Sequence, residues 1–579
     1  MMKVNNILTI SAVVALSLTG CDDMFEPGIE QHPDFEQQIV SNPSYFYGLL
    51  MTPYSKLNDQ NTFISNRIHE DLATSDFYTN QLTDSWLLMG RGSWTAKNNP
   101  VDKWKDVRES MQYINIFLEN MDRVTWSKNE ENNAKFKKRL TGEAYALRGL
   151  MNYFFLRAHA GYVEGESQMM GVPILTASED VNSDFNLPRA TFKETLDQIM
   201  SDFDVAIQNL PDVYTGDDLV YGQGRNGLIN GTIVKALKSE AALMAASPLY
   251  ASESGITWQQ AADYVAEILQ GHQIVPGGNT WYDDTEEINA FNNGSLPPEA
   301  IWRGDRTGED DVAFEKDCYP PSLYGSGRCT PTQNLVDAFP MANGYPINEA
   351  GSGYNAQNPY ANRDPRLDLY VIHHGSTFKG TTINVSPDDN TNKDGLNMTN
   401  ATFTGYYLKK FMNEEVDVSS AAGKANGRRH YKARIRYTEL FLNYAEAQFE
   451  ATKDFNSAGK LGMSPYEIIK AIRQRGGITN DTYLEKLRTS GTEAQIRALI
   501  HNERRIELMG ENFRFWDLRR WNDPVNDPLN EPIKRMKVSN GTYNVETIDE
   551  LRYEDYMYFG PMPENEVLKW SNLKQNKGW

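Results

Sequence analysis

The sequence predicts a mainly α-helical protein, in which a scaffold of helix-turn-helix repeats carries a large inserted lobe that is rich in loops and contains short strands. Three observations predict this fold class. Apolar residues recur at helical spacing from residue 101 to residue 270, the periodicity stops between residues 271 and 428, and it returns at residue 434. Because helices are expected on both sides of the irregular part, the lobe interrupts the scaffold.

The first helices are expected at Val101–Val124, Asn132–Ala160 and Thr191–Leu210, where apolar residues lie three or four positions apart. The second of them carries one apolar stripe, made of Ala144, Leu147, Met151, Phe154 and Ala158. A stripe of this kind is typical of a helix that packs one face against its neighbours.

The next pair of helices is expected at Ile229–Ser252 and Thr257–Gln270, joined by a Ser-Gly turn. The first of the pair carries small residues where two helices would cross closely, namely Ala241, Ala242, Ala245 and Ala246. This arrangement favours helix-turn-helix repeats.

The irregular stretch from Gly271 to Arg428 is crowded with Gly, Pro, Asn and Asp around short strand-like runs such as Ala300–Arg303 and Tyr406–Leu408. Function is usually placed on insertions of this type. Helices return at Arg434–Ala451, Pro465–Arg475 and Thr492–Met509.

We therefore divide the chain into a removed signal peptide at residues 1–20, an N-terminal helical region at 21–270, the loop-rich lobe at 271–433 and a C-terminal helical region at 434–579.

The N-terminus reads as an export signal. Lys3 supplies the charged start, and the apolar run Ile7–Leu18 is too short to span a bilayer. The segment Leu18-Thr19-Gly20-Cys21 has the form of a lipobox, so we expect lipid attachment at Cys21 and stable anchoring to the outer membrane. Asp22 and Asp23 resemble the export mark of lipoproteins displayed on the cell surface, although a solvated linker would have the same charge.

Composition excludes several classes of partner. The chain has 579 residues and a formal charge of -21, and an anionic field of that size repels the phosphates of nucleic acid. Three cysteines cannot form a four-Cys metal site, and the eight histidines show no ligand spacing. No metal and no cofactor is predicted.

Two motifs match ligand-binding patterns only in part. The run Gly222-Gln223-Gly224-Arg225-Asn226-Gly227 fits a dinucleotide-binding pattern, but no buried strand precedes it, so a plain loop is expected. The oxygens from Asp388 to Asp394 have calcium-loop spacing, yet Lys393 stands where that loop needs glycine and Thr399 where it needs glutamate. Whether calcium binds near Asp388 is left open.

A disulfide is predicted between Cys318 and Cys329. They are the thiols left once Cys21 carries lipid, and an exported protein reaches a compartment where disulfides persist. The Pro- and Gly-rich segment between them is expected to form a loop.

Aromatic residues away from the helical stripes are the candidate platforms for a sugar ring. A flat ring that covers ~50 Å² of a sugar's C–H face contributes about 1 kcal/mol, and neighbouring polar side chains can bond its hydroxyls. Some of these rings could instead close the core of the lobe. The predicted ligand-binding residues are Asp59, Asn61, Asp84, Trp86, Arg91, Trp94, Trp281, Tyr319 and Tyr324.

No catalytic residue is predicted. A chain with 78 acidic residues can always supply two carboxylates for glycoside hydrolysis, but nothing in the sequence singles out a pair. Glu503 and Glu507 stand among several arginines and aromatic residues, which favours a structural ion-pair network.

Several blocks in a fixed order carry a family resemblance. They are Gly142–Gly149 with Tyr153-Phe154, Leu335–Phe339, Asp364-Pro365-Arg366, Leu442–Ala447, Glu503–Leu508, Arg514–Trp521 and the ending Asn572–Asn576. Together with the lipobox, these blocks are similar to the SusD/RagB family of outer-membrane nutrient-binding lipoproteins. The resemblance implies a tetratricopeptide-like scaffold, display on the cell surface, glycan binding without catalysis, and a SusC-like TonB-dependent transporter barrel as partner.

The expected function is therefore capture of an oligosaccharide at the cell surface and its delivery to the partner transporter. Two alternatives stay open at this point: a surface glycoside hydrolase, and an adhesin or assembly scaffold that binds no oligosaccharide. The family's glycan-contacting loops vary, so the resemblance carries over no ligand residue and does not identify the glycan.

Overall fold

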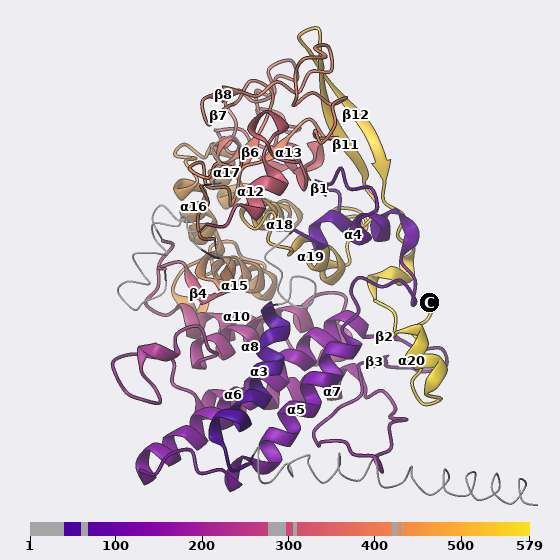
Figure 1. Cartoon of the computed structure of the whole chain (residues 1–579). Coiled ribbons are helices and arrows are strands. Elements are labelled where there is room, and N and C mark those ends of the chain that lie inside the picture. The colour runs from indigo at the N-terminus through magenta and orange to yellow at the C-terminus, as the bar shows by residue number, and fades with distance from the viewer. Residues whose placement is uncertain are drawn as a thin grey trace, which may run out of the picture.

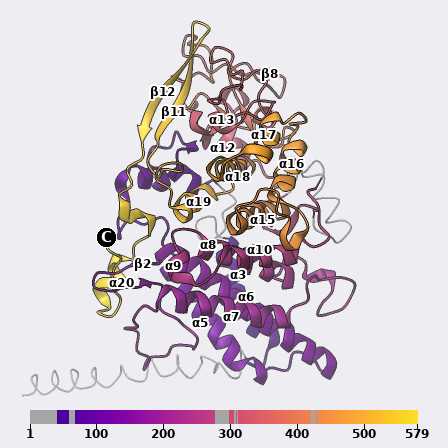
Figure 2. The same cartoon turned by 180° about the vertical axis from the view of Figure 1, so that it is seen from behind.

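The computed structural model describes residues 40–58, 68–275, 297–304, 308, 310–419, 426–430 and 433–579. The N-terminal helices form one end of the molecule and the loop-rich lobe forms the other, and the C-terminal helices lie between them (Figure 1). The view from behind shows the same order (Figure 2). The predicted mainly α-helical class with an inserted irregular lobe is confirmed.

The N-terminal end is a stack of neighbouring helices in contact with one another along the chain. The predicted helices are confirmed to within a few residues, except that the predicted helix Ile229–Ser252 is divided into α8, which ends at Ala246, and a short α9 (Ala251–Ser254). One further helix, α3, was missed. The stack consists of α3 (Pro43–Asn58), α5 (Trp104–Asn120), α6 (Glu130–His159), α7 (Phe192–Asn209), α8 (Gly231–Ala246) and α10 (Trp258–Leu269).

Local chemistry explains where these helices begin. The Thr191 hydroxyl accepts a hydrogen bond from the Glu194 N–H while the Glu194 carboxylate accepts one from the Thr191 N–H, a capping box that satisfies two free donors at the start of α7. Thr257 and Gln260 repeat this arrangement at α10. The predicted stripe of α6 is buried, with Leu147 and Met151 fully inside the core.

The C-terminal helices complete the scaffold. Helix α15 packs on α10, α16 and α18, so helices from both ends of the sequence share one hydrophobic core. The elements are α15 (Tyr437–Thr452), α16 (Pro465–Arg475), α17 (Thr482–Ser490), α18 (Glu493–Glu507), α19 (Arg514–Trp521) and, near the chain end, α20 (Glu564–Lys569).

The lobe has a second core and consists of loops, short helices and two-stranded antiparallel sheets. Its sheets pair β1 (Phe77–Tyr78) with β5 (Thr330–Pro331), β6 (Val371–Ile372) with β9 (Tyr407–Leu408), and β7 (Thr377–Phe378) with β8 (Thr381–Thr382). Its short helices are η2 (Glu70–Ala73), α4 (Ser85–Leu88), α12 (Ala313–Cys318), α13 (Gln333–Ala338) and α14 (Arg366–Tyr370).

Of two further sheets, one joins distant parts of the chain and the other is a local hairpin. The predicted strand β4 (Ala300–Arg303) is confirmed and pairs with β10 (Ala433–Arg436), which leads directly into α15. The hairpin of β11 (Pro532–Ser539) and β12 (Thr542–Glu550) rises along one side of the lobe (Figure 1). The predicted domain boundaries stay a prediction.

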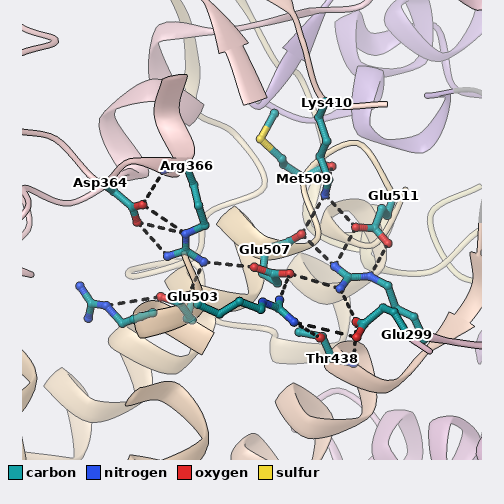
Figure 3. Close-up of polar contacts among 12 residues, drawn as sticks. Glu299, Asp364, Arg366, Lys410, Thr438, Glu503, Glu507, Met509 and Glu511 are labelled. Atoms are coloured by element: carbon teal, nitrogen blue, oxygen red, sulfur yellow. Dashed lines mark hydrogen bonds and ion pairs between the residues drawn. The ribbon is translucent and has the colours of Figure 1, made fainter. Parts of the chain in front are cut away.

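A buried network of charges joins the lobe to the scaffold (Figure 3). Arg366 of α14 bonds Glu503 of α18 at 2.6 Å, and Lys410, just after β9, bonds Glu511 at 2.8 Å. Arg436 of β10 also donates to Glu511, at 2.9 Å. Glu507 of the same network contacts Arg366 at 3.2 Å, so the structural reading of Glu503 and Glu507 is confirmed.

The C-terminal segment is fastened by a buried arginine. Arg189 donates to the carbonyl oxygens of Met170, in β3 (Met169–Met170), and of Gly171, which follows it. It also donates to Oδ1 of Asn576, at 2.7 Å. The amide of Asn576 donates in turn to the carbonyl oxygens of His159 and Gly560, at 3.0 and 2.6 Å. The ending noted in the sequence therefore closes the scaffold beside β2 (Gly161–Tyr162).

Candidate ligand-binding surface

Two predicted sugar platforms, Trp86 and Trp94, lie in the core of the lobe. Trp94 is 2% exposed, its indole N–H donates to Oδ1 of Asn99 at 2.8 Å, and its ring lies 4.8 Å from that of Trp579. Trp86 is 9% exposed and meets the ring of Phe515 edge-on. A ring enclosed in this way has no free face for a sugar, so both predictions are wrong.

Asp84 and Arg91 are engaged in structural contacts. The Asp84 carboxylate caps α4 by accepting from the backbone N–H groups of Trp86 and Leu87, at 2.9 and 3.2 Å. The Arg91 guanidinium forms an ion pair with Asp549 of β12 and lies over the ring of Tyr78. These contacts hold the loop around α4 against the hairpin.

The loop from residue 319 to residue 328 contains one buried and one exposed tyrosine. Tyr319 is wrongly predicted as a platform, because its ring is fully buried and its hydroxyl donates to the Asn413 carbonyl oxygen. Tyr324 is 59% exposed and adopts a left-handed φ of 66° at the tip of the loop. It is the predicted aromatic residue that the structure leaves available to a ligand.

The predicted disulfide is not formed in the structure, where Cys318 and Cys329 are both free thiols. Other bonds already close this loop: Arg328 donates from its backbone N–H and its side chain to Asp317, both at 2.9 Å. A hydrogen bond between the thiols and burial raise the pKa of Cys318 well above its ordinary value.

Four further predicted residues, Asp59, Asn61, Trp281 and the lipidation residue Cys21, lie outside the described residues. Their predictions stay predictions.

An open cleft of about 250 Å³ lies in the lobe, between the end of α14 and the β7–β8 hairpin. Its polar lining comes from side chains that bond hydroxyl groups well, and its floor is apolar. The lining residues are Asp368, Val371, Ile372, His373, Ser376, Thr377, Phe378 and Lys409. Sequence reasoning missed this site, although the polar run His373-His374-Gly375-Ser376 after a strand was a signal for it.

Charged groups at the mouth of the cleft hold one another in place. Nε2 of His373 lies 2.9 Å from the Asp368 carboxylate, and the Lys409 ammonium donates to the Asp368 carbonyl oxygen at 3.2 Å. The hydrogen bond from His373 is the main cause that lowers the pKa of Asp368, so this carboxylate is ionised at neutral pH. The cleft thus offers both acceptors and donors.

Aromatic rings stand beside the cleft. The ring of Tyr360 stacks on His373 with 3.8 Å between ring centroids, and Tyr543 of β12 meets Tyr360 edge-on at 5.8 Å. Tyr360 and Tyr543 are each partly exposed. Behind the cleft, Tyr319 packs against the cleft residue Phe378 at 5.4 Å.

The loop from Asp388 to Asp394, which has the oxygen spacing of a calcium-binding loop, forms hydrogen bonds with other parts of the protein. The Asp388 carboxylate accepts from the Ser539 hydroxyl at 2.7 Å and from the Asn540 N–H at 2.6 Å, which fastens the loop to the tip of the hairpin. Within the described ranges, no group of three or more His, Cys, Asp or Glu residues is placed to hold a metal ion. In the same ranges, no helix combines the length and the apolar character that crossing a bilayer requires.

Two family models match the chain. The model of the SusD family matches residues 291–579, and a model described as "starch-binding associating with outer membrane" matches residues 30–221. The matches reach into both helical regions and the lobe, and they leave out residues 222–290.

Individual proteins that resemble this chain also carry SusD-like names. SusD-like protein P38 of Formosa agariphila is 21% identical over 91% of this chain and 93% of its own length. A SusD-like protein of Bacteroides fragilis has a crystal structure with a TM-score of 0.71 and 22% identity, covering 95% of this chain and 99% of that one.

A second structure from Bacteroides fragilis, of a SusD-like carbohydrate-binding protein, has a TM-score of 0.69 and 18% identity, covering 93% of this chain and 100% of that one. The likeness to both crystal structures confirms the tetratricopeptide-like helical scaffold with its inserted lobe.

Proposed function

Because the chain belongs to the SusD family, we propose that it is a lipid-anchored protein of the outer membrane that binds an oligosaccharide at the cell surface without cleaving it. Two comparisons support binding of carbohydrate: one matching family model names starch binding at the outer membrane, and one protein of the same fold is named as carbohydrate-binding.

The cleft in the lobe is the single observation that carries the proposal. Sugar hydroxyls are recognised by side chains that both accept and donate hydrogen bonds, and Asp368, Ser376, Thr377 and Lys409 supply both roles within one open space. The partly exposed ring of Tyr360 stands next to them, stacked on His373. This combination of a few polar groups with apolar walls is usual for small-molecule sites.

The proposal includes a partner. In it, a SusC-like TonB-dependent transporter receives the oligosaccharide, the helical scaffold docks on the transporter barrel, and the lobe holds the sugar over its extracellular mouth. The position of the cleft on the lobe, away from the N-terminal helices, supports this division of labour (Figure 1).

Binding is tested by calorimetric titration with a panel of oligosaccharides. For a glycan that binds, Asp368→Ala and Lys409→Ala should each weaken affinity by about ten-fold, which corresponds to ~1.4 kcal/mol. Asp389→Ala is the matched control, because Asp389 is exposed in the same lobe and bonds only its neighbours Thr391 and Asn392 among the contacts described. Equal affinity in all three variants would contradict the assignment of the cleft.

The purified protein and the same oligosaccharide panel also distinguish the binding protein from a glycoside hydrolase and from an adhesin or scaffold. If a bound glycan is cleaved at enzymatic rates by the purified protein, the non-catalytic proposal is wrong and the hydrolase alternative is favoured. If no oligosaccharide of the panel binds saturably, the adhesin or scaffold alternative is favoured.

A further inference from the structure

A small cavity with several charged side chains in its lining lies where the helices of the two ends of the chain meet. It has a volume of about 50 Å³, and α6, α8, α15, α18 and α19 contribute to its walls. A space of this size is sufficient for ordered water, provided that polar partners are present.

Two carboxyl groups face each other there. Glu240 of α8 and Glu439 of α15 both line the cavity and lie within hydrogen-bonding reach of each other. Glu439 is 1% exposed. Two carboxylates can share a hydrogen bond only when one of them carries a proton.

Four polar atoms around the cavity indicate a bound water molecule. Oε1 of Glu439, Nδ2 of Asn443, Nε1 of Trp516 and Nε of Arg157 are buried and have no hydrogen-bond partner among the described residues. Asn443 is 1% exposed, and its amide oxygen is already taken by Arg504. Three donors and one acceptor around a polar cavity are the partners that a buried water molecule needs.

The charged groups near Glu240 and Glu439 balance one negative charge, which is the charge of this pair when it carries a single proton. Arg157 attracts Glu240 more strongly than any other cation does. Arg504 is paired with Asp517 at 2.6 Å, and Arg520 is bonded both to Asp517, at 2.9 Å, and to Glu446, so these two arginines are balanced by two acidic residues.

The other charged or titratable groups nearby are neutral or paired. Burial raises the pKa of Tyr153 to about 12, and that of Tyr250 is raised further, so both are neutral. Arg436 and Glu511 pair with each other at 2.9 Å. Glu240 is partly exposed and Glu439 is buried, and if both were ionised, one negative charge at the cavity would be uncompensated.

We propose that this cavity binds ordered water together with a single proton shared by Glu240 and Glu439, and that the shared proton holds α8 against α15. Burial raises the pKa of both carboxyl groups, to about 7 for Glu240, which supports the same reading. A group with a raised pKa stabilises the fold at low pH, and this contribution is lost as the pH rises through the folded-state pKa. The scaffold should therefore weaken as the pH rises from about 4.5, the ordinary pKa of a glutamate, to about 7.

The test is the melting temperature of the full chain and of Glu240→Gln between about pH 5 and about pH 9. The amide of glutamine supplies a donor that does not titrate, so the wild-type protein should lose stability as the pH rises from about 5 to about 7 while the variant does not. Glu446→Gln is the matched control on α15: Glu446 is paired with Arg520, so this variant should be less stable at every pH.

Infrared spectroscopy gives a second readout. The wild-type protein should show the C=O band of a protonated carboxyl group at about pH 6, and Glu240→Gln and Glu439→Gln should each lack it. Parallel stability curves, or absence of this band from the wild-type protein, would overturn the shared proton. If the variants do not fold, a crystal structure of the wild-type protein decides, and a cavity without water density overturns the water site.

Discussion

At the scale of single residues, Asn576 shows how one amide can fasten a chain end. It accepts from Arg189 and donates to two backbone carbonyl oxygens of distant segments. We expect Asn576→Ala to lower the free energy of unfolding by about 1–3 kcal/mol, because the Arg189 guanidinium, which has no acidic partner in these contacts, loses an acceptor inside the protein.

Urea unfolding measures this effect. Lys577→Ala is the control at the neighbouring position, since its side chain is 70% exposed and its ion pair with Glu164 is long, at 3.8 Å. Equal losses in both variants would show that the C-terminal segment is not fastened by the amide.

Trp94 and Tyr324 should separate stability from binding. Trp94→Ala removes a buried ring and should cost about 3–5 kcal/mol of unfolding free energy, with unchanged glycan affinity in the protein that stays folded. Tyr324→Ala removes an exposed ring and should leave unfolding nearly unchanged. Thermal unfolding and calorimetric titration of both variants test this, and weakened glycan binding by Trp94→Ala alone would contradict the placement of its ring.

The misplaced tryptophans show what sequence reasoning lacked. A glycine-bounded loop indicates that the chain turns, but it does not say on which side of the turn a ring lies. Trp94 is enclosed by Phe515 and Trp579, more than 400 positions away in the sequence, so no local pattern could reveal its burial. The cleft was missed for the same reason, since Lys409 reaches Asp368 only through the pairing of β6 with β9.

At the scale of elements, the parts that depend on local chemistry were predicted best. Helix α16 was predicted with its bounds because Pro465 stands at its first position after the capping residue Ser464. Strand β4 was also predicted with its bounds. Helix α3 was missed because it contains Pro53, and the sequence alone does not show that tertiary packing tolerates a proline there.

The network around α18 makes a prediction about acid stability. Burial raises the pKa of Glu507, but attraction by Arg475, Arg436 and Arg366 outweighs it and leaves the pKa at about 2, below the ordinary 4.5. A lowered pKa contributes stability above the ordinary value, and this is lost as the pH falls toward about 2. At ~1.4 kcal/mol for each pKa unit, the contribution at neutral pH is about 3 kcal/mol.

Glu507→Gln should therefore lower the free energy of unfolding at neutral pH. The difference in unfolding free energy between this variant and the wild-type protein should become smaller as the pH falls from about 5 to about 2. Urea unfolding at several pH values measures this difference. Glu267→Gln on α10 is the control, because that carboxylate is 54% exposed in its pair with Lys460 and should change stability little. A constant difference between Glu507→Gln and wild type would contradict the assigned pKa.

At the scale of the whole molecule, the arrangement follows from where charge and apolar surface are buried. One core unites helices from both ends of the chain, a second core fills the lobe, and the network of Figure 3 connects the two. In the proposed function, the helical scaffold docks on the transporter while the loops of the lobe present polar side chains to the sugar. The sequence indicated this division because helical periodicity stops and returns, but it could not indicate the three-dimensional cleft.

Attachment to the membrane concerns the whole molecule and depends on one residue. In the proposed function, Cys21 of the lipobox carries the acyl chains, and more than one chain is what makes membrane binding stable. Cys21→Ala should therefore move the protein from the outer-membrane fraction to the soluble fraction and abolish metabolic labelling with palmitate. Asp389→Ala, at an exposed site of the lobe, should leave both properties unchanged. Cys21 lies before the first described residue, Val40, and the cleft is lined by residues between Asp368 and Lys409, so the released protein should keep its glycan affinity. Membrane retention or palmitate labelling of Cys21→Ala would contradict the lipid anchor.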